Sequence, residues 1–112
     1  MKIAIPLQDG ELATHFGHCQ EFALFDVSES EESIPEPEKL SAPPHQPGLL
    51  PKWLQDHGAD VIIAGGMGRR AQSLFAQNGI EAVVGAKDRD PKVIVSQYLE
   101  DSLSTGENLC DH

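Results

Sequence analysis

Hydrophobic residues in the first half of the chain form short runs that are typical of β-strands. Lys2–Leu7 is rich in isoleucine, and Glu21–Val27 combines aromatic and branched side chains that suit a half-buried pleated surface. A shorter strand is expected around Lys39–Ala42, where charge and proline discourage pairing along an exposed edge. The long connection that includes Thr14–Cys19 is of a kind that often carries function. The acidic, proline-rich segment Ser28–Pro44 resembles a disordered linker in composition, but a linker needs domains on both sides, so the segment is interpreted as a solvated hairpin that includes the edge strand around Lys39–Ala42.

The second half of the chain alternates between helical and strand patterns. Leu50, Trp53 and Leu54 have the i, i+3, i+4 spacing of an amphipathic helix. A short, continuous apolar run follows and is typical of a strand buried on both faces. In chain order, the elements expected here are a helix from Leu49 to His57, a strand at Asp60–Ala64, a helix at Arg69–Gln77, a strand at Ile80–Val84 and a helix from Asp90–Pro91 onward.

The predicted order of elements is β-β-β-α-β-α-β-α within a single domain that spans residues 1–112. Strands separated by helices form right-handed parallel crossovers, whereas the first three strands can pair antiparallel. The pattern therefore predicts an α/β fold in which a mixed sheet has helices on both faces. Residues 104–112 form a polar, glycine-interrupted tail that can be mobile.

Composition and charge exclude several classes of partner. The chain has 112 residues, and its 8 Lys and Arg against 18 Asp and Glu give a formal net charge of −10. This excess of acid disfavours binding to a nucleic-acid backbone or to an anionic membrane surface. The two cysteines, Cys19 and Cys110, cannot form a four-thiolate metal site within one chain.

The N-terminal residues lack the features of an export signal. The apolar stretch Ile3–Leu7 is too short for a signal-peptide core, and no small-residue cleavage site follows it. The longest purely apolar run, Val61–Ala64, is far shorter than a membrane span. We therefore expect a cytoplasmic location, where thiols and metal ligands are more common than disulfides.

The first group of candidate metal ligands lies in the connection between the first two strands. His15 and His18 are three residues apart, and the thiol of Cys19 is adjacent to His18. Imidazole and thiolate suit zinc, copper or iron better than calcium or magnesium, and Gly17 permits a tight backbone path. The alternative is a buried Cys19 beside two ordinary polar histidines, and the spacing alone does not separate these interpretations.

Further candidate ligands lie elsewhere in the chain. Cys110 and His112 are close together in the last residues, so this tail could fold over the first loop and complete a mixed Cys/His site. His45 is another possible contributor, because it precedes a helix in a loop expected near one end of the sheet. For the tail, a frayed terminus without fixed contacts is the alternative. His57, at the end of a helix, is explained by the helix dipole.

A glycine-rich turn precedes the second helix and is a candidate anion seat. Gly65–Gly68 would present backbone N–H groups at the positive end of the helix dipole. Arg69 and Arg70 add positive charge in an otherwise acidic chain. The turn also matches a loose dinucleotide fingerprint, Gly-x-Gly-x-x-Ala, with Asp88 about 20 residues further on. A dinucleotide needs two mononucleotide-binding halves, for which too little chain follows, and a tight turn without a ligand is the simplest alternative.

Together, these motifs resemble the dinitrogenase iron–molybdenum cofactor-binding family, small domains related to the assembly and carriage of the nitrogenase cofactor. The resemblance covers nearly the whole chain, and the acidic segment 28–44 is the least similar part. The residues that carry it are Met1–Pro6, His15–Cys19 with Phe22, Ile63–Ala71, Gly79–Ile80, Gly85–Ala86 and Asn108–His112.

The resemblance implies a ribonuclease-H-like, three-layer α/β/α fold and a non-enzymatic protein. The implied cofactor is an anionic iron–sulfur-type cluster, either the iron–molybdenum cofactor or a precursor, which purification in air can leave unbound. The implied partners are cofactor-assembly or acceptor proteins, and we expect a monomer or a weak homodimer. The predicted metal ligands are His15, His18, Cys19, His45, Cys110 and His112, and the predicted cofactor-binding residues are Gly65, Gly66, Met67, Gly68, Arg69 and Arg70.

Two other functions stay open at this point. The glycine turn could bind a nucleotide or a phosphate group, either in a simple binding module or in an enzyme that acts on such a ligand. The same histidines and cysteines could instead hold a structural zinc ion in a small interaction protein.

Overall fold

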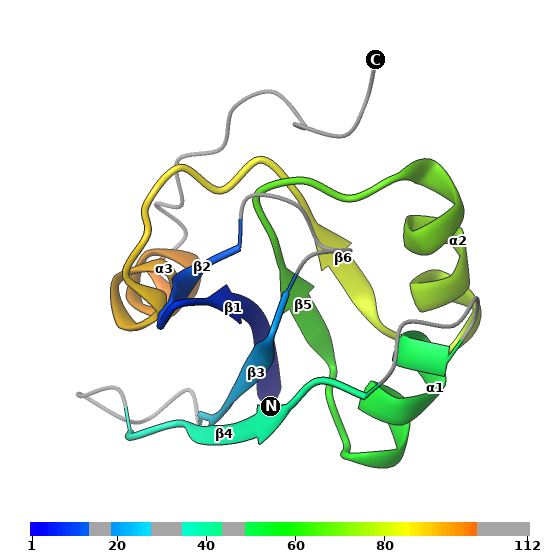
Figure 1. Cartoon of the computed structure of the whole chain (residues 1–112), viewed down its shortest axis with the longest axis horizontal. Helices are drawn as coiled ribbons and strands as arrows, with labels where there is room; N and C mark the ends of the chain where they lie inside the picture. Colours follow the sequence, from blue (N-terminus) through cyan, green and yellow to red (C-terminus); the bar gives the residue numbers. More distant parts are fainter. Residues whose placement is uncertain (14–18, 28–34, 44–48, 101–112) are drawn as a thin grey trace.

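A mixed β-sheet lies at the centre of the fold, in the strand order β4-β3-β1-β5-β6, with β2 paired to β1 beside this path (Figure 1). The computed structural model describes residues 1–13, 19–27, 35–43 and 49–100. The strands are β1 (Lys2–Gln8), β2 (Glu11–Leu12), β3 (Glu21–Asp26), β4 (Glu38–Ser41), β5 (Val61–Ile63) and β6 (Glu81–Val83). Strands β1 to β4 pair antiparallel, whereas β1 with β5 and β5 with β6 pair parallel.

Local sequence signals account for the ends of the helices, which are α1 (Leu49–Asp56), α2 (Arg69–Gln77) and α3 (Pro91–Leu99). Helix α3 starts with a proline, and the Asp90 carboxylate before it accepts a hydrogen bond from the Lys92 N–H at 3.0 Å. Just beyond α2, Gly79 has a φ of 74°, a left-handed conformation that glycine adopts without strain. None of the helices in the described part of the chain is long and apolar enough to cross a membrane.

The helices cover both faces of the sheet. Side chains of α1 and α2 pack on one face in a cluster that includes Leu54, Ile62 and Phe75, and Ile94 and Val95 of α3 pack on the other face. Strand β1 contributes to both clusters because successive side chains of a strand point to opposite faces, so Ala4 faces α1 and α2 while Ile3 and Ile5 face α3. The architecture is a three-layer α/β/α arrangement.

The structure confirms the predicted fold class. It adds one strand, β2, whose two residues are too few to produce a recognisable hydrophobic period. The other elements occur in the predicted order, with ends that differ from the expected ones by a few residues. Residues 101–112 lie outside the described residues, so the single domain over residues 1–112 and the mobile tail stay predictions.

Candidate functional site

The first predicted ligand loop is anchored on both sides to the carboxyl end of β1. The N–H of Ala13 donates to the carbonyl of Pro6 at 2.9 Å, and the N–H of Gln20 donates to the carbonyl of Leu7 at 2.8 Å. Pro6 and Leu7 are adjacent in β1, so the residues that flank segment 14–18 lie beside the same end of that strand. The segment itself, with His15 and His18, lies outside the described residues.

The second predicted loop follows the neighbouring strand. Strands β1 and β5 pair in parallel, with Ile3 opposite Val61 and Ala4 opposite Ile62, so their carboxyl ends meet at one edge of the sheet. Figure 1 shows the chain leaving the end of β5 on its way to α2 at this edge. Ligands of open α/β sheets bind outside the carboxyl ends of the strands. The residues that flank segment 14–18 and the glycine turn therefore lie at the same end of the sheet.

The start of the glycine turn is fixed by hydrogen bonds that continue the pairing of β5 with β6. The N–H of Ala64 donates to the carbonyl of Val83 at 2.9 Å, and the N–H of Gly85 donates to the carbonyl of Gly65 at 3.1 Å. The N–H of Ala86 donates to the carbonyl of Ala64 at 3.2 Å. The backbone of Ala64 and Gly65 is thus tied to the residues at and just after the end of β6, and the turn to α2 follows.

Beyond this point the turn passes from the interior of the protein to its surface. Gly65, Gly66 and Met67 are buried, whereas Gly68, Arg69 and Arg70 are exposed. Gly68 is the N-cap of α2 with φ −67° and ψ 158°, and among the described residues no side chain caps this helix end. The positive end of the helix dipole and two arginines consequently lie together at the surface.

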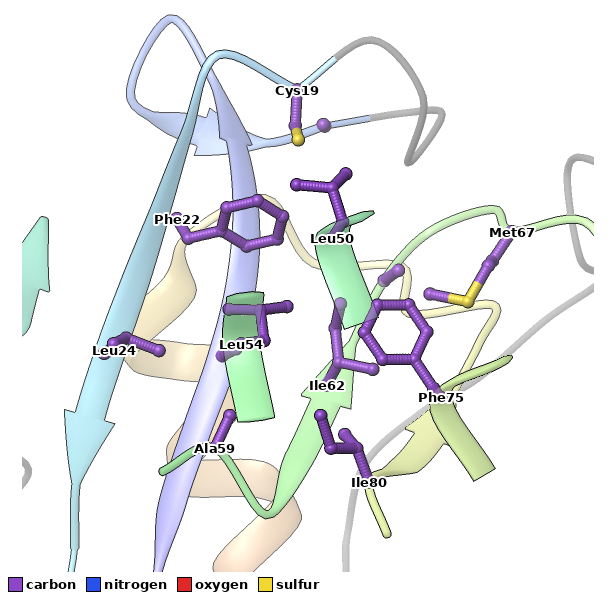
Figure 2. Packing of buried hydrophobic residues seen from close by; sticks show 13 residues of the cluster. Cys19, Phe22, Leu24, Leu50, Leu54, Ala59, Ile62, Met67, Phe75 and Ile80 are labelled. Atoms are coloured by element: carbon purple, nitrogen blue, oxygen red, sulfur yellow. The ribbon is translucent and has the colours of Figure 1, made fainter. Parts of the chain in front are cut away.

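Cys19 lies at the same end of the molecule, in the hydrophobic cluster beneath the loops. Its side chain is 5% exposed, and Figure 2 shows it close to Leu50 of α1. Burial raises the pKa of the Cys19 thiol from 9.0 to about 11, although a backbone hydrogen bond at Cys19 lowers it in part. The thiol is therefore protonated at neutral pH, whereas a metal binds the thiolate.

Met67 belongs to the same cluster and is fully buried. In Figure 2 its side chain extends toward Phe75, and both Cys19 and Met67 lie at the loop end of the cluster. The neighbourhood of the two motifs thus has an apolar, sulfur-containing floor, and exposed positive charge lies at the N-terminus of α2.

The structure describes only part of the predicted site. Segments 14–18, 44–48 and 101–112 lie outside the described residues, and with them the predicted ligands His15, His18, His45, Cys110 and His112. The flanks of segment 44–48 are nevertheless placed, because the N–H of Ala42 donates to the carbonyl of Gln20 at 2.9 Å and Leu50 packs in the cluster with Cys19. Among the described residues, no group of three or more His, Cys, Asp or Glu side chains could hold a metal ion.

Two residues weighed from the sequence have local structural roles. The Asp88 carboxylate accepts a hydrogen bond from the N–H of Asp90 at 3.1 Å, which stabilises the turn before α3. The ring of His57 packs edge-on against the ring of Trp53, with 4.7 Å between the ring centroids. Gln72, in contrast, had no signal in the sequence, yet its side-chain amide donates to the carbonyl of Met67 at 2.9 Å and so contacts the glycine turn.

The fold and the site define a class of protein. It is a three-layer α/β domain in which a glycine turn and Cys19 lie near the carboxyl ends of two adjacent parallel strands. The sequence profile described as "Dinitrogenase iron-molybdenum cofactor" matches residues 1–101. The chain belongs to this family, as its motifs predicted.

The chain is also similar to individual proteins and solved structures. The uncharacterized protein MJ0580 of Methanocaldococcus jannaschii is 28% identical over 110 residues, which cover 96% of this chain and 92% of that protein. The crystal structure of PH0822 superposes with a TM-score of 0.86 and 28% identity over 97% of both chains. The apo form of the orange protein from Desulfovibrio gigas has the same fold, with a TM-score of 0.72 and 20% identity over 96% of this chain and 93% of that chain.

Proposed function

We propose that this protein binds an anionic iron–sulfur-type cluster, such as the iron–molybdenum cofactor or a precursor, and carries it for assembly or delivery without catalysing a reaction. The observation that supports this proposal most is that the residues flanking segment 14–18 and the turn Gly65–Gly68 lie at the same edge of the sheet. Ala13 and Gln20 are hydrogen-bonded to the carboxyl end of β1, and the turn Gly65–Gly68 follows β5, the parallel neighbour of β1. The family, whose description names the iron–molybdenum cofactor, supplies the class of ligand.

In this proposal the two loops divide the work of binding. The N–H groups of the glycine turn, with Arg69 and Arg70, attract the negative charge of the cluster. The soft and borderline ligands predicted for its metal atoms are His15, His18, Cys19, His45, Cys110 and His112. This mixed set would leave part of the cluster exposed, which suits transfer to an acceptor protein.

Among the predicted ligands, Cys19 is one that the structure describes, and its thiol is buried and protonated. Ligation by Cys19 would require loss of the thiol proton and movement of the side chain toward the loop. The burial supports a role of Cys19 in the floor beneath the cluster at least as well as a role in ligation. Replacement by alanine tests ligation, and replacement by serine keeps the size of the side chain.

A phosphate-containing ligand is the second candidate, and the N-terminus of α2 favours it. The start of α2 is capped by no side chain of the described residues, is preceded by a glycine turn and begins with two arginines, so it attracts phosphate as readily as a cluster anion. Calorimetry with mononucleotides and dinucleotides would detect this function. Saturable binding of a nucleotide that is unaffected by loss of both cysteines would favour it over the cluster.

The experiment for the cluster is anaerobic reconstitution with iron(II) and sulfide, with and without molybdate, followed by visible absorption and metal analysis. We expect the wild type to become coloured and the double variant R69Q/R70Q to retain much less metal. The double variant K39Q/K52Q, which removes two surface charges elsewhere, is the matched control and should load normally. If both the wild type and the double variant C19A/C110A stay colourless and metal-free, the proposed function is wrong.

A further inference from the structure

Three carbonyl groups of the glycine turn, those of Gly65, Met67 and Gly68, accept hydrogen bonds from other parts of the protein. The carbonyl of Gly65 accepts a hydrogen bond from the N–H of Gly85 at 3.1 Å. The carbonyl of Met67 accepts one from the side-chain amide of Gln72 at 2.9 Å. The carbonyl of Gly68 accepts one from the N–H of Gln72 at 3.1 Å. Two of these three bonds come from a single residue of α2.

The orientation of the carbonyls determines where the amides point. In a trans peptide the C=O and N–H groups point in opposite directions, and the described residues contain no cis peptide bond. Because the Met67 carbonyl is directed at the Gln72 side chain, the N–H of Gly68 in the same peptide unit is directed the opposite way. Apart from its chain neighbours and the backbone of its own helix, no heavy atom of the described residues would lie within 4 Å of a Cβ placed on Gly68, so the space at this Cβ position is open.

We propose that Gln72 is a positioning residue for the anion seat: its side-chain amide fixes the Met67–Gly68 peptide so that the Gly68 N–H faces the bound anion. This inference rests on the proposed function, because it concerns the same seat. The main-chain bond from Gln72 to Gly68 is an ordinary helical bond that any residue except proline would make. The bond to Met67 requires a side-chain donor at this position.

The N-cap of α2 explains why such a residue is needed. A Ser, Thr, Asp or Asn side chain at the N-cap normally accepts bonds from N–H groups of the first turn and also fixes the entry of the chain. Gly68 has no side chain and cannot do either. Gln72 fixes the path of the chain into α2 by donating a hydrogen bond to a carbonyl. It therefore occupies none of the backbone N–H groups in the first turn of the helix. The start of the helix is held by this bond, and no capping side chain of the described residues uses its N–H groups.

The opposite end of α2 contains a chemically matched bond that serves as a control. The side-chain amide of Asn78 donates to the carbonyl of Leu74 at 2.8 Å. The variants Q72M and N78L each replace an amide by an uncharged side chain of similar size, and each removes one amide-to-carbonyl bond from the same helix. Only Q72M removes it beside the glycine turn.

The test measures binding of tetrathiomolybdate, a small molybdenum–sulfur dianion, to the wild type and both variants under anaerobic conditions. We expect affinity to fall about tenfold in Q72M, the scale of one lost hydrogen bond, and to stay within about twofold in N78L. Thermal melting of the three proteins shows whether Q72M is folded. Equal affinities of the wild type and Q72M would overturn the positioning role.

NMR spectra of the ligand-free proteins separate this inference from the proposed function. In Q72M, the Met67 carbonyl carbon and the Gly68 amide should shift, and the variant Q72K, which returns a donor, should restore them toward the wild-type positions. Unchanged signals in Q72M would overturn the inference even if the cluster binds. A wild type that binds no tetrathiomolybdate, although the Met67 and Gly68 signals shift in Q72M, would contradict the proposed anion seat. The shifts would still confirm that Gln72 fixes the Met67–Gly68 peptide.

Discussion

Cys19 and Met67 are buried in the same hydrophobic cluster, although they belong to loops that follow different strands. Their side chains lie at the end of the cluster from which both loops emerge (Figure 2). The parallel pairing of β1 with β5 produces this relationship, since it brings the carboxyl ends of the two strands together. Residues next to both loops are therefore packed in one hydrophobic cluster.

The reactivity of Cys19 tests the description of this floor. Burial raises the pKa of its thiol from 9.0 to about 11, which at pH 8 lowers the thiolate fraction about a hundredfold. Alkylation should be measured in the variant C110A, so that Cys19 is the sole reactive thiol. We expect slow modification of the folded protein that accelerates as the pH approaches 11, and fast modification in denaturant. Rapid alkylation of the folded protein at pH 8 would show that the thiol is not buried as described.

The same shift predicts a dependence of stability on pH. Because the folded pKa lies above the unfolded one, the neutral thiol stabilises the fold below about pH 9, and this contribution is lost as the pH rises toward about 11. The difference in the free energy of unfolding between the wild type and C19A should therefore shrink over this interval. Denaturant titrations of both proteins at several pH values provide the measurement, and a constant difference would contradict it.

Replacement by alanine should affect the stability of the protein very differently at the two glycines next to α2. Gly68 has a φ of −67° and open space at its Cβ position, so G68A should change the free energy of unfolding by less than about 0.5 kcal/mol. Gly79 has a φ of 74°, so G79A should cost about 1–2 kcal/mol. Urea denaturation measures both changes.

The binding of tetrathiomolybdate should depend on Gly68 and not on Gly79, the reverse of their effects on stability. A methyl group at residue 68 would project into the space where an anion approaches the backbone, so G68A should weaken the binding of tetrathiomolybdate about tenfold, which corresponds to about 1.4 kcal/mol. G79A, at the far end of the helix, should bind as the wild type does while it is folded. Normal binding by G68A would mean that the anion does not contact this part of the turn.

The single tyrosine provides a test of the packing of α3 against β6. Burial of Tyr98 raises its pKa above 10.0, and the negative charge of Glu81 and a hydrogen bond to its side chain raise it further. The pKa measured from phenolate absorbance should be above 10.0 in the wild type and lower in E81Q. The contribution of the neutral phenol to stability is therefore present below about pH 10 and is lost as the pH rises through the folded pKa. An identical titration in E81Q would contradict the contact.

The fold could be predicted from the sequence to the extent that hydrophobic periods are long enough to read. The aromatic and branched residues of β3 and the continuous apolar run of β5 identify these strands, and proline after Asp90 marks the start of α3. Strand β2 was not predicted, because pairing with β1, and not its own two residues, makes it a strand. The glycine turn was predicted because strand, glycines and helix are contiguous in the sequence.

The geometry of the candidate site could be predicted less completely. Sequence spacing identified Cys19 and its neighbouring histidines as candidate ligands, but it could not show that Cys19 is buried and protonated, since burial depends on Leu50 and other residues far along the chain. The hydrogen bond from Gln72 to Met67 could not be predicted from the sequence either, because a glutamine in a helix has many possible partners. The roles of His15, His18, His45, Cys110 and His112 stay predictions.

The most direct measurement of the central claim is an anaerobic NMR titration of the wild-type protein with tetrathiomolybdate, with sulfate as a tetrahedral dianion that lacks metal–sulfur bonds. We predict that the amide signals of Gly66 and Gly68 shift with saturation on addition of tetrathiomolybdate and respond much more weakly to sulfate, while the signal of Lys39 in β4 does not move. Saturable shifts that leave the signals of Gly66 and Gly68 unmoved, or no saturable shifts at all, would contradict the claim that the glycine turn holds a metal–sulfur anion.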